Sequence, residues 1–270
     1  MKIKLKVLGC RGSIPRSGKE FEQYGGATSS YAIRIGERLV VLDAGTGILR
    51  VSDFMEPGEK EMTLLLSHTH ADHLLGLPMC LPAFNKDFTF HVYGKTRGGL
   101  TVKEQVCKYL ETPTWPVNTD KLPANFIYRE LEDGMVLPGE PEILVNIMEA
   151  DHPNGCSLIK LQAMDKTIVY ATDCTITDAN RAEMAEFARR ANILLIDGQY
   201  TPAELGGKPG FGHNSWTDAA EFGQLCGARR TLIIHHDPYH KDVDLDRATE
   251  DVYYIDPSVN LAYEGEEIEL

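Results

Sequence analysis

A seven-residue segment, 67–73, constrains this chain more than any other part of it. The segment reads S-H-T-H-A-D-H, so it holds three histidines and one aspartate in the pattern H-x-H-x-D-H. It follows the apolar run T-L-L-L at 63–66, which predicts a buried strand. A cluster of histidine and aspartate at the end of such a strand is typical of a metal site rather than of a polar surface loop.

The spacing of these four residues predicts how they would face a metal. On an extended segment alternate side chains share a face, so we expect His68 and His70 to point the same way. If the chain then turns into a helix, Asp72 and His73 leave it in neighbouring directions. The segment therefore offers two nitrogens to one metal, and a carboxylate with a nitrogen to a second. Zinc and other borderline metals favour these ligands.

Composition places the chain among ordinary soluble globular proteins. Its 270 residues, 43% hydrophobic and 25% charged, suit a single domain over residues 1–270. No apolar run approaches the roughly 18–20 residues that cross a bilayer, so we expect no membrane association. The six cysteines form no C-x-x-C pair, and the first residues alternate charged and apolar side chains instead of forming a signal peptide. These features predict reduced thiols and a cytoplasmic location.

The charge balance limits the class of substrate. The formal net charge is −13, whereas proteins that bind long nucleic acids usually carry a basic surface. We therefore expect no extended nucleic-acid binding. A small anionic substrate stays compatible with this charge, because metal ions dominate the local charge of their site.

Short apolar runs separated by glycine and polar turns predict a mixture of strands and helices. We predict strands at 2–8, 31–35, 38–42, 63–66, 88–93, 127–130, 142–149, 156–162, 167–171, 192–196 and 231–234. We predict helices at 99–110, 176–190 and 216–226. Thr177 and Ser215 are the expected N-caps of the second and third helices. The acidic tail, 256–270, is expected to hold one strand, and the glycine-rich residues 198–214 are expected to be mobile.

Three further ligand-type residues lie where predicted strands end. They are His152, Asp173 and His235, and each follows an apolar run. Sites at strand ends are the usual arrangement of layered α/β enzymes. Each metal in a site of this kind takes three or four protein ligands, so one segment cannot complete two metal sites, and these three residues are the candidates to do so.

Together these motifs resemble those of the metallo-β-lactamase superfamily, and the resemblance covers nearly the whole chain. It implies an α/β fold, a four-layer αββα sandwich with a dinuclear site at one edge. The implied ligands are His68, His70 and His152 for one metal, Asp72, His73 and His235 for the second, and Asp173 as a bridge between both. Asp43 is implied to orient a ligand histidine through a hydrogen bond.

Further motifs resemble one branch of that superfamily. The sequence G-H-N-S at 212–215 is similar to the G-H-S-T element of ribonuclease Z and its phosphodiesterase relatives. The segments L-G-C-R-G-S at 8–13, Y-G-G at 24–26 and H-H-D-P at 235–238 resemble a bacterial subgroup related to the cyclic phosphodiesterase of phosphonate metabolism. The chain lacks a counterpart to the long arm with which ribonuclease Z holds tRNA. It also lacks the N-terminal cysteine cluster of the phosphonate enzyme.

The implied centre suits hydrolysis. Two divalent metals about 3.5–4 Å apart can hold a bridging hydroxide and stabilise charge on a phosphoryl group. The leaving oxygen then needs a proton, and His213 is our candidate donor. Asp72 is expected to take part in catalysis as well as in metal binding. We expect zinc, with manganese or iron as alternatives that accept the same ligands.

Four other charged or titratable residues are expected to stay outside the chemistry. His236 and His240 lie beside a candidate ligand and are expected at the surface or behind the ligands. Arg11 and Lys208 could steer an anion, but a solvated charge in a glycine-rich loop is the commoner case.

We therefore predict a cytoplasmic metal-dependent phosphodiesterase that acts on a small cyclic or nucleotide phosphodiester. Three alternatives stay open: a ribonuclease Z-like RNA endonuclease, a hydrolase of carboxyl esters, lactones or thioesters, and a degenerate fold retained for binding. A homodimer is the expected assembly, since dimers are the commonest oligomers.

Overall fold

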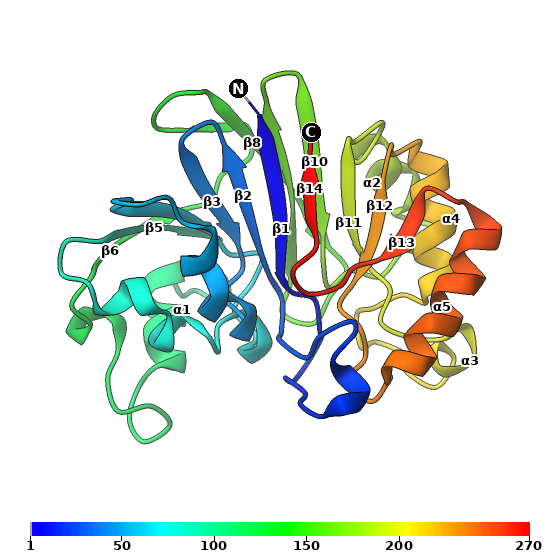
Figure 1. Ribbon diagram of the computed structural model, residues 1–270, viewed down its shortest axis with the longest axis horizontal. Coiled ribbons are helices and arrows are strands. Elements are labelled where there is room, and N and C mark those ends of the chain that lie inside the picture. The colour runs from blue at the N-terminus through cyan, green and yellow to red at the C-terminus, as the bar shows by residue number, and fades with distance from the viewer. Residues whose placement is uncertain (1) are drawn as a thin grey trace. The chain divides into compact units, whose positions relative to one another are not determined.

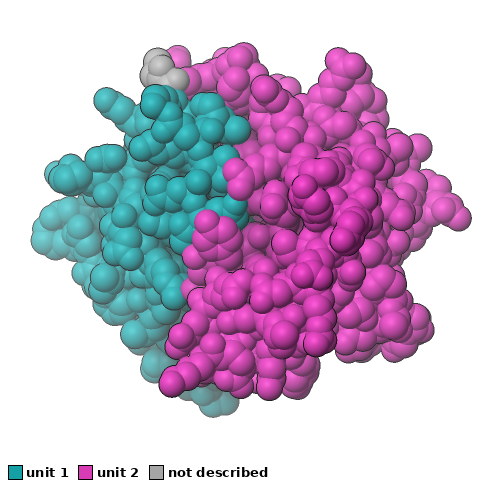
Figure 2. Space-filling model, turned by 45° about the vertical axis from the view of Figure 1, so that its right-hand side comes forward, with its two compact units in different colours: residues 1–9, 27–131, 265–270 teal, residues 10–26, 132–264 magenta. Residues whose placement is uncertain are grey.

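The computed structural model describes residues 2–270. The chain divides into two compact units, which Figure 2 distinguishes by colour. The first unit comprises residues 1–9, 27–131 and 265–270, and the second comprises residues 10–26 and 132–264. Each unit contains one seven-stranded sheet. The organisation as a single domain stays a prediction.

The sheet of the first unit combines antiparallel and parallel strands. Its strands are β1 (Ile3–Gly9), β2 (Ser30–Ile35), β3 (Arg38–Leu42), β4 (Glu61–Leu65), β5 (Thr89–Gly94), β6 (Asn125–Glu130) and β14 (Glu267–Glu269). Their order is β14-β1-β2-β3-β4-β5-β6, and the neighbours from β3 to β6 are parallel. Because β3 and β4 are parallel neighbours, the residues that follow both strands emerge at the same edge. The strands predicted for this part of the chain are confirmed, with small shifts at their ends.

The helix predicted over 99–110 is shorter than expected. It is α1 (Val102–Tyr109), and Thr101 is its N-cap. The Thr101 hydroxyl accepts a hydrogen bond from the Glu104 amide, and the Glu104 carboxylate accepts one from the Thr101 amide. This capping box fixes the start of the helix after Gly99, which the prediction included. The first unit also contains 3₁₀ turns at Thr46–Phe54, Ala71–His73, Leu77–Met79, Leu81–Phe84 and Thr119–Lys121.

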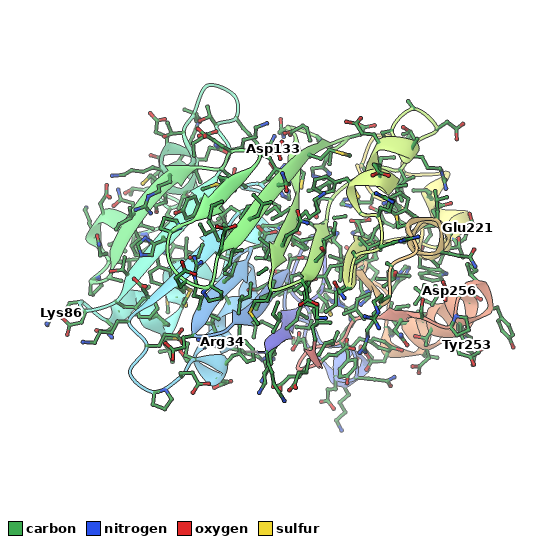
Figure 3. The ribbon with its side chains drawn as sticks, turned by 90° about the horizontal axis from the view of Figure 1, so that it is seen from above. Arg34, Lys86, Asp133, Glu221, Tyr253 and Asp256 are labelled. Carbon is green, nitrogen blue, oxygen red and sulfur yellow. The ribbon has the colours of Figure 1, made fainter. Side chains whose placement is uncertain are left out.

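The first unit has its own apolar core. Alternate residues of β3, β4 and β5, such as Val41, Leu64 and Val92, are buried together with the inward side of α1. One charged pair connects β2 to the loop that precedes β4. The guanidinium of Arg34, labelled in Figure 3, donates hydrogen bonds of 2.7 and 2.9 Å to the two carboxylate oxygens of Glu59. A bidentate pair of this kind has a defined geometry as well as charge.

The sheet of the second unit brings several strand ends to one edge. Its strands are β7 (Met135–Leu137), β8 (Ile143–Ala150), β9 (Cys156–Ala163), β10 (Lys166–Ala171), β11 (Ile193–Asp197), β12 (Thr231–Ile234) and β13 (Val259–Leu261). Their order is β13-β12-β11-β10-β9-β8-β7, with β10 to β13 parallel. β8 and β10 are both antiparallel to β9, so β8 runs in the same direction as β10, β11 and β12. The carboxyl ends of these four strands therefore lie at a common edge.

In the second unit the bounds and the N-cap predicted for one helix are corrected, and the prediction for the other helix is confirmed. The helix predicted over 176–190 is α2 (Arg181–Phe187), with Asn180 instead of Thr177 as its N-cap. The side chains of Thr177 and Asn180 each accept a hydrogen bond from the other's backbone amide, which holds the preceding residues in a turn. The third prediction is confirmed: α4 (Trp216–Cys226) begins after Ser215 and ends at Gly227 in the left-handed conformation.

Two helices and two strands were not anticipated. α3 (Pro202–Leu205) lies within the glycine-rich segment, and α5 (Asp242–Ile255) is the longest helix of the described chain. The short strand β7 was also not predicted, and the tail holds two strands instead of one. Figure 1 shows α4 and α5 side by side against β11, β12 and β13. Their apolar faces complete the core of this unit, which includes Phe222 and Val252. None of the helices between residues 2 and 270 combines the length and apolar composition needed to span a bilayer.

Candidate metal centre

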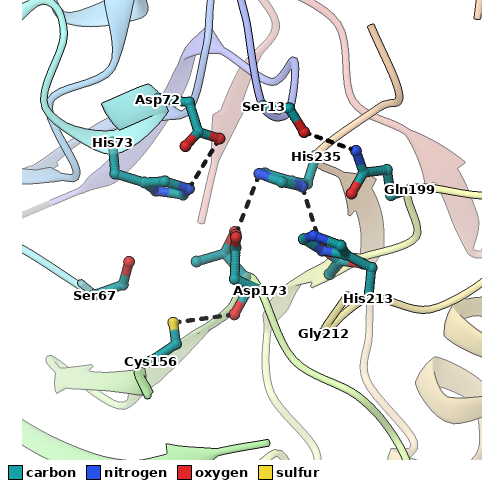
Figure 4. Close-up of polar contacts among 12 residues, drawn as sticks. Ser13, Ser67, Asp72, His73, Cys156, Asp173, Gln199, Gly212, His213 and His235 are labelled. Carbon is teal, nitrogen blue, oxygen red and sulfur yellow. Dashed lines mark hydrogen bonds and ion pairs between the residues drawn. The ribbon is translucent and has the colours of Figure 1, made fainter. Parts of the chain in front are cut away.

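In the first unit the candidate ligands come from one short segment. The rings of His68 and His70 lie 4.4 Å apart between centroids, and so do those of His68 and His73. The three imidazoles are thus gathered in one place, whereas the spacing predicted only that His68 and His70 share a face. The 3₁₀ turn Ala71–His73 supplies the bend that brings Asp72 and His73 back towards the pair. His73 Nε2 lies 3.4 Å from Oδ2 of Asp72, a contact drawn in Figure 4.

Asp43 holds this segment from the neighbouring strand. It follows β3, is fully buried, and adopts a left-handed backbone with φ of 57°. One carboxylate oxygen accepts a hydrogen bond of 2.8 Å from the Ser67 amide, and the other accepts hydrogen bonds of 2.7 Å from the Ser67 hydroxyl and from His73 Nδ1. Asp43 therefore fixes the orientation of His73, the role that the family resemblance implied.

In the second unit the candidate ligands come from separate strand ends. His152 follows β8, Asp173 follows β10 and His235 follows β12. The two carboxylate oxygens of Asp173 lie 3.6 Å from His152 Nε2 and 3.3 Å from His235 Nε2. Asp173 and His235 both have positive φ, 48° and 63°. Non-glycine residues in this conformation are uncommon and concentrate at functional sites.

Four histidines share one arrangement of their ring nitrogens. Nδ1 contacts an acceptor in each: the Ser67 hydroxyl for His68 (3.1 Å), Asp43 for His73 (2.7 Å), the Gly212 carbonyl for His152 (3.2 Å) and Asp197 for His235 (3.3 Å). A hydrogen held at Nδ1 leaves the lone pair on Nε2. Metal-binding histidines usually show this pattern, in which a partner of one nitrogen sets the tautomer and the other nitrogen binds the ion. The donor set of imidazoles and carboxylates therefore fits divalent metals.

Asp197 is the functional residue that sequence reasoning left without a role. It ends β11 and is fully buried. Its Oδ2 accepts a 2.8 Å hydrogen bond from His213 Nδ1 and lies 3.3 Å from His235 Nδ1, while Oδ1 accepts a hydrogen bond from the Asn214 amide. Burial acts to raise the pKa of Asp197, but His213 and His235 outweigh it and keep that pKa below its ordinary value. One carboxylate thus orients a candidate ligand and the candidate proton donor together.

His213 is packed among other rings. Its centroid lies 4.9 Å from that of His235, 5.4 Å from that of His152 and 5.8 Å from that of Tyr200. Gly212, with φ of 86°, permits this approach, because a Cβ there would lie 2.2 Å from Nδ1 of His152. One ligand-type atom from each of Asp173, His213 and His235 lies within 4.8 Å of the others. His213 is therefore close enough for either proton transfer or metal binding.

Three expectations about neighbouring charges were wrong or incomplete. Arg11 is not solvated: it is fully buried and donates hydrogen bonds to the backbone carbonyls of Gly25, Asp237 and His240. His236 and His240 are buried, which excludes the surface and leaves the other expected place, behind the ligands. His236 Nε2 donates to a backbone carbonyl, and burial, aided by the charge of Arg11, lowers its pKa to about 3. His240 Nε2 lies 3.0 Å from the Glu204 carboxylate. These side chains tie the loop after His235 to the rest of the second unit.

Comparison with known proteins covers the segment that holds the candidate ligands. A family model described as "Beta-lactamase superfamily domain" matches residues 38–236. The probable metallo-hydrolase YhfI of Bacillus subtilis (strain 168) is 22% identical over 274 residues, which cover 97% of this chain and 98% of that protein. Its crystal structure gives a TM-score of 0.75 at 20% identity and covers both chains completely.

Two further solved structures resemble the whole chain. A diphosphatase from the PhnP family gives a TM-score of 0.70 at 18% identity, covering 100% of this chain and 98% of that one. The short form of human tRNase Z gives a TM-score of 0.69 at 17% identity and covers 98% of each chain. Likenesses at these identities establish the fold.

The chain belongs to the beta-lactamase superfamily. The α/β fold expected from the sequence, that of the metallo-β-lactamase αββα sandwich, is confirmed, and so is the resemblance to this superfamily. The protein is a hydrolase of the metallo-β-lactamase fold, and its histidine and aspartate clusters suit divalent metal ions.

Proposed function

We propose that this hydrolase cleaves a small anionic phosphodiester at a dinuclear zinc centre. The proposed ligands are His68, His70 and His152 for one ion, Asp72, His73 and His235 for the other, and Asp173 for both. The observation that carries the proposal is the shared arrangement of the histidines. Their Nδ1 atoms contact acceptors, and the Nε2 atoms of His73, His152 and His235 lie 3.3–3.6 Å from carboxylate oxygens. Manganese and iron accept the same ligands.

The chemistry divides between the ions and the chain. When bound, two divalent ions lower the pKa of water towards neutrality and stabilise charge on phosphoryl oxygens. Asp72 is proposed as a ligand and as an acceptor for a hydrogen of the attacking water. His213 is proposed as the proton donor to the leaving oxygen in its protonated form, in which Nδ1 donates to Asp197 and Nε2 carries the proton that is transferred.

The His213–Asp197 pair favours a substrate whose leaving group must be protonated. An alkoxide leaving from phosphorus is strongly basic and needs a proton as it departs, whereas a thiolate leaves without one because its pKa is near 8.5. The pair therefore supports a phosphodiester over a thioester. The acidic net charge of −13 supports a small phosphodiester over a long RNA.

The test is a substrate screen with zinc and manganese each supplied to the purified protein. It includes cyclic and linear phosphodiesters, a lactone, a thioester and a tRNA precursor. We expect kcat/KM for at least one small phosphodiester to exceed that for the carboxyl substrates on the order of 100-fold, a difference in the range of one proton-transfer group. Faster turnover of the lactone or thioester, or specific cleavage of the tRNA precursor, would assign the protein to one of the alternatives. A metal content well below two ions per chain would revive a binding role.

Location and assembly belong to the same proposal. All six cysteines are free thiols, which agrees with a reducing compartment such as the cytoplasm. A homodimer is the proposed assembly, and its mass in solution is measurable by light scattering.

A further inference from the structure

We infer that the loop before His213 forms a subsite for the leaving group of the substrate. The loop reads G-G-K-P-G-F-G at 206–212, and the subsite consists of Phe211 and Lys208, with the Tyr200 ring against Lys208. Its geometry points to a leaving group that combines a flat ring with negative charge, as a nucleotide does. The inference rests on the proposed function, because a proton donor must lie beside the leaving oxygen and His213 therefore marks the side of the site where that group departs.

Ring contacts connect the subsite to His213. The Lys208 ammonium lies 4.9 Å from the centroid of the Tyr200 ring and 5.5 Å from that of Phe211. The Tyr200 ring stands edge-on to His213 with centroids 5.8 Å apart. The Tyr200 ring therefore lies between Lys208 and the proposed proton donor, and Phe211 joins this chain of contacts through the Lys208 ammonium.

The backbone turns these side chains in opposite directions. Phe211 is 54% exposed and His213 only 8%, although one residue separates them. That residue is Gly212, whose positive φ allows the reversal. An exposed phenyl ring gains nothing from the core, but it offers a face on which a planar ligand can stack. Tyr200 is 3% exposed and offers its ring to the Lys208 ammonium.

The charge of Lys208 is unusual for its surroundings. The chain has 40 acidic and 27 basic residues, and the segment 206–212 has no acidic residue. Within residues 2–270, Lys208 forms no ion pair with a carboxylate, and its ammonium lies instead against two aromatic faces. A cation held in this way keeps hydrogen-bond donors for a ligand. Lys208 and the exposed Phe211 ring together would bind a ligand that has both a ring and an anionic group more tightly than a simple sugar phosphate.

Binding measurements on the metal-loaded protein separate the contribution of stacking on Phe211 from that of the charge of Lys208. Isothermal titration would use ribose 5-phosphate, adenosine 5′-monophosphate and adenosine 3′,5′-bisphosphate. We expect the monophosphate to bind on the order of tenfold more tightly than ribose 5-phosphate, the range of one stacked base. We expect the bisphosphate to gain a further factor of about two to five, the range of one exposed charge pair.

Two variants then assign these factors to residues. Phe211→Ala should bring the monophosphate close to ribose 5-phosphate, and Lys208→Gln should abolish the gain of the bisphosphate. Neither should change the affinity for ribose 5-phosphate. Tyr253→Ala and Lys86→Gln, surface residues labelled in Figure 3, are controls matched in ring and charge and should leave all three affinities unchanged.

The outcomes separate the subsite from the proposed reaction. Equal wild-type affinity for the monophosphate and ribose 5-phosphate, no binding of either, or an unchanged ratio in Phe211→Ala would overturn the subsite. If the ratio falls in Phe211→Ala but no phosphodiester is hydrolysed, the subsite stands and the reaction is wrong. If phosphodiesters are hydrolysed without any effect of the base, the reaction stands and the subsite is wrong.

Discussion

The two units build their candidate ligand clusters in contrasting ways. In the first unit four ligand-type residues lie within residues 68–73, and one buried carboxylate, Asp43, holds the segment. In the second unit the corresponding residues follow strands that are far apart in the chain, and Asp197 contacts two histidines of different roles. A contiguous cluster needs one strand and one turn, whereas a dispersed cluster needs the whole sheet to be in register.

Backbone strain occurs at strand ends in both units. Asp43, Asp173 and His235 each adopt a positive φ directly after a strand. The conformation turns the chain sharply, so that a residue at the strand end can point along the edge instead of continuing the alternation of the strand. Aspartate and histidine tolerate it better than most side chains. The dispersed cluster uses this device twice, while residues 68–73 turn through a 3₁₀ segment.

The largest expected effect tests whether Asp173 joins the metals of the two clusters. Asp173→Ala should lower kcat/KM on the order of 10⁴-fold, since it removes a ligand from ions that contribute several kcal/mol to the transition state. Bound metal, measured by plasma mass spectrometry, should fall for both ions. His70→Ala should cost one ion. Asp165→Ala, in the exposed tip between β9 and β10, is the control. Loss of one ion only in Asp173→Ala would contradict the bridging assignment.

A second prediction asks whether the dispersed cluster supplies an acid as well as ligands. His213→Ala should lower kcat on the order of 10²–10⁴-fold, the range of a general acid. Metal content should stay at the wild-type value. The effect should shrink for a phosphodiester with a nitrophenolate leaving group, which departs without protonation. A drop in metal content would show instead that His213 is a ligand, the alternative that its distance from Asp173 and His235 allows.

A third prediction concerns the fastening of the loop after His235. Arg11→Met should lower the free energy of unfolding of the metal-free protein by about 3 kcal/mol, because the carbonyls of Gly25, Asp237 and His240 lose a charged donor. Urea unfolding measures this change through the midpoint at constant slope. Arg16→Met is the control, since Arg16 lies over the Phe21 and Tyr239 rings and should cost below about 1 kcal/mol. Equal losses in both variants would contradict a special role of Arg11.

The contrast between the units also separates what the sequence could predict from what it could not. Residues 67–73 could be interpreted because strand and turn place neighbours in sequence as neighbours in space. The capping signals of α4 were equally local, so its start and end were predicted correctly, whereas Thr177 forms a turn before α2 instead of its N-cap. α5 was missed although it is long, because its 14 residues include five acidic ones and its apolar face is narrow.

Local sequence patterns could not predict contacts between residues that follow different strands. Asp197 and His213 pair because β11 ends beside the loop that carries His213, and no spacing in the sequence marks that meeting. Arg11 was misjudged for a related reason. A charge in a glycine-rich loop is usually solvated, and only the fold shows that three backbone carbonyls converge on this one.

The smallest expected effects compare the two units most directly, because each unit has one carboxylate, Asp43 or Asp197, that contacts a candidate ligand histidine. Asp43→Asn and Asp197→Asn should each weaken metal binding about 10–100-fold, the usual cost of losing such a partner. Excess zinc should restore the activity of Asp43→Asn, because Asp43 orients the proposed ligand His73 and holds Ser67.

Excess zinc should not restore Asp197→Asn. Its carboxylate also holds His213, so the variant should keep a lowered kcat when both ions are bound, and the defect should lessen with a nitrophenolate leaving group. Titrating each variant with zinc while measuring kcat decides the matter. Full recovery of Asp197→Asn would mean that Asp197 serves His235 alone, and the two clusters would then differ in layout but not in chemistry.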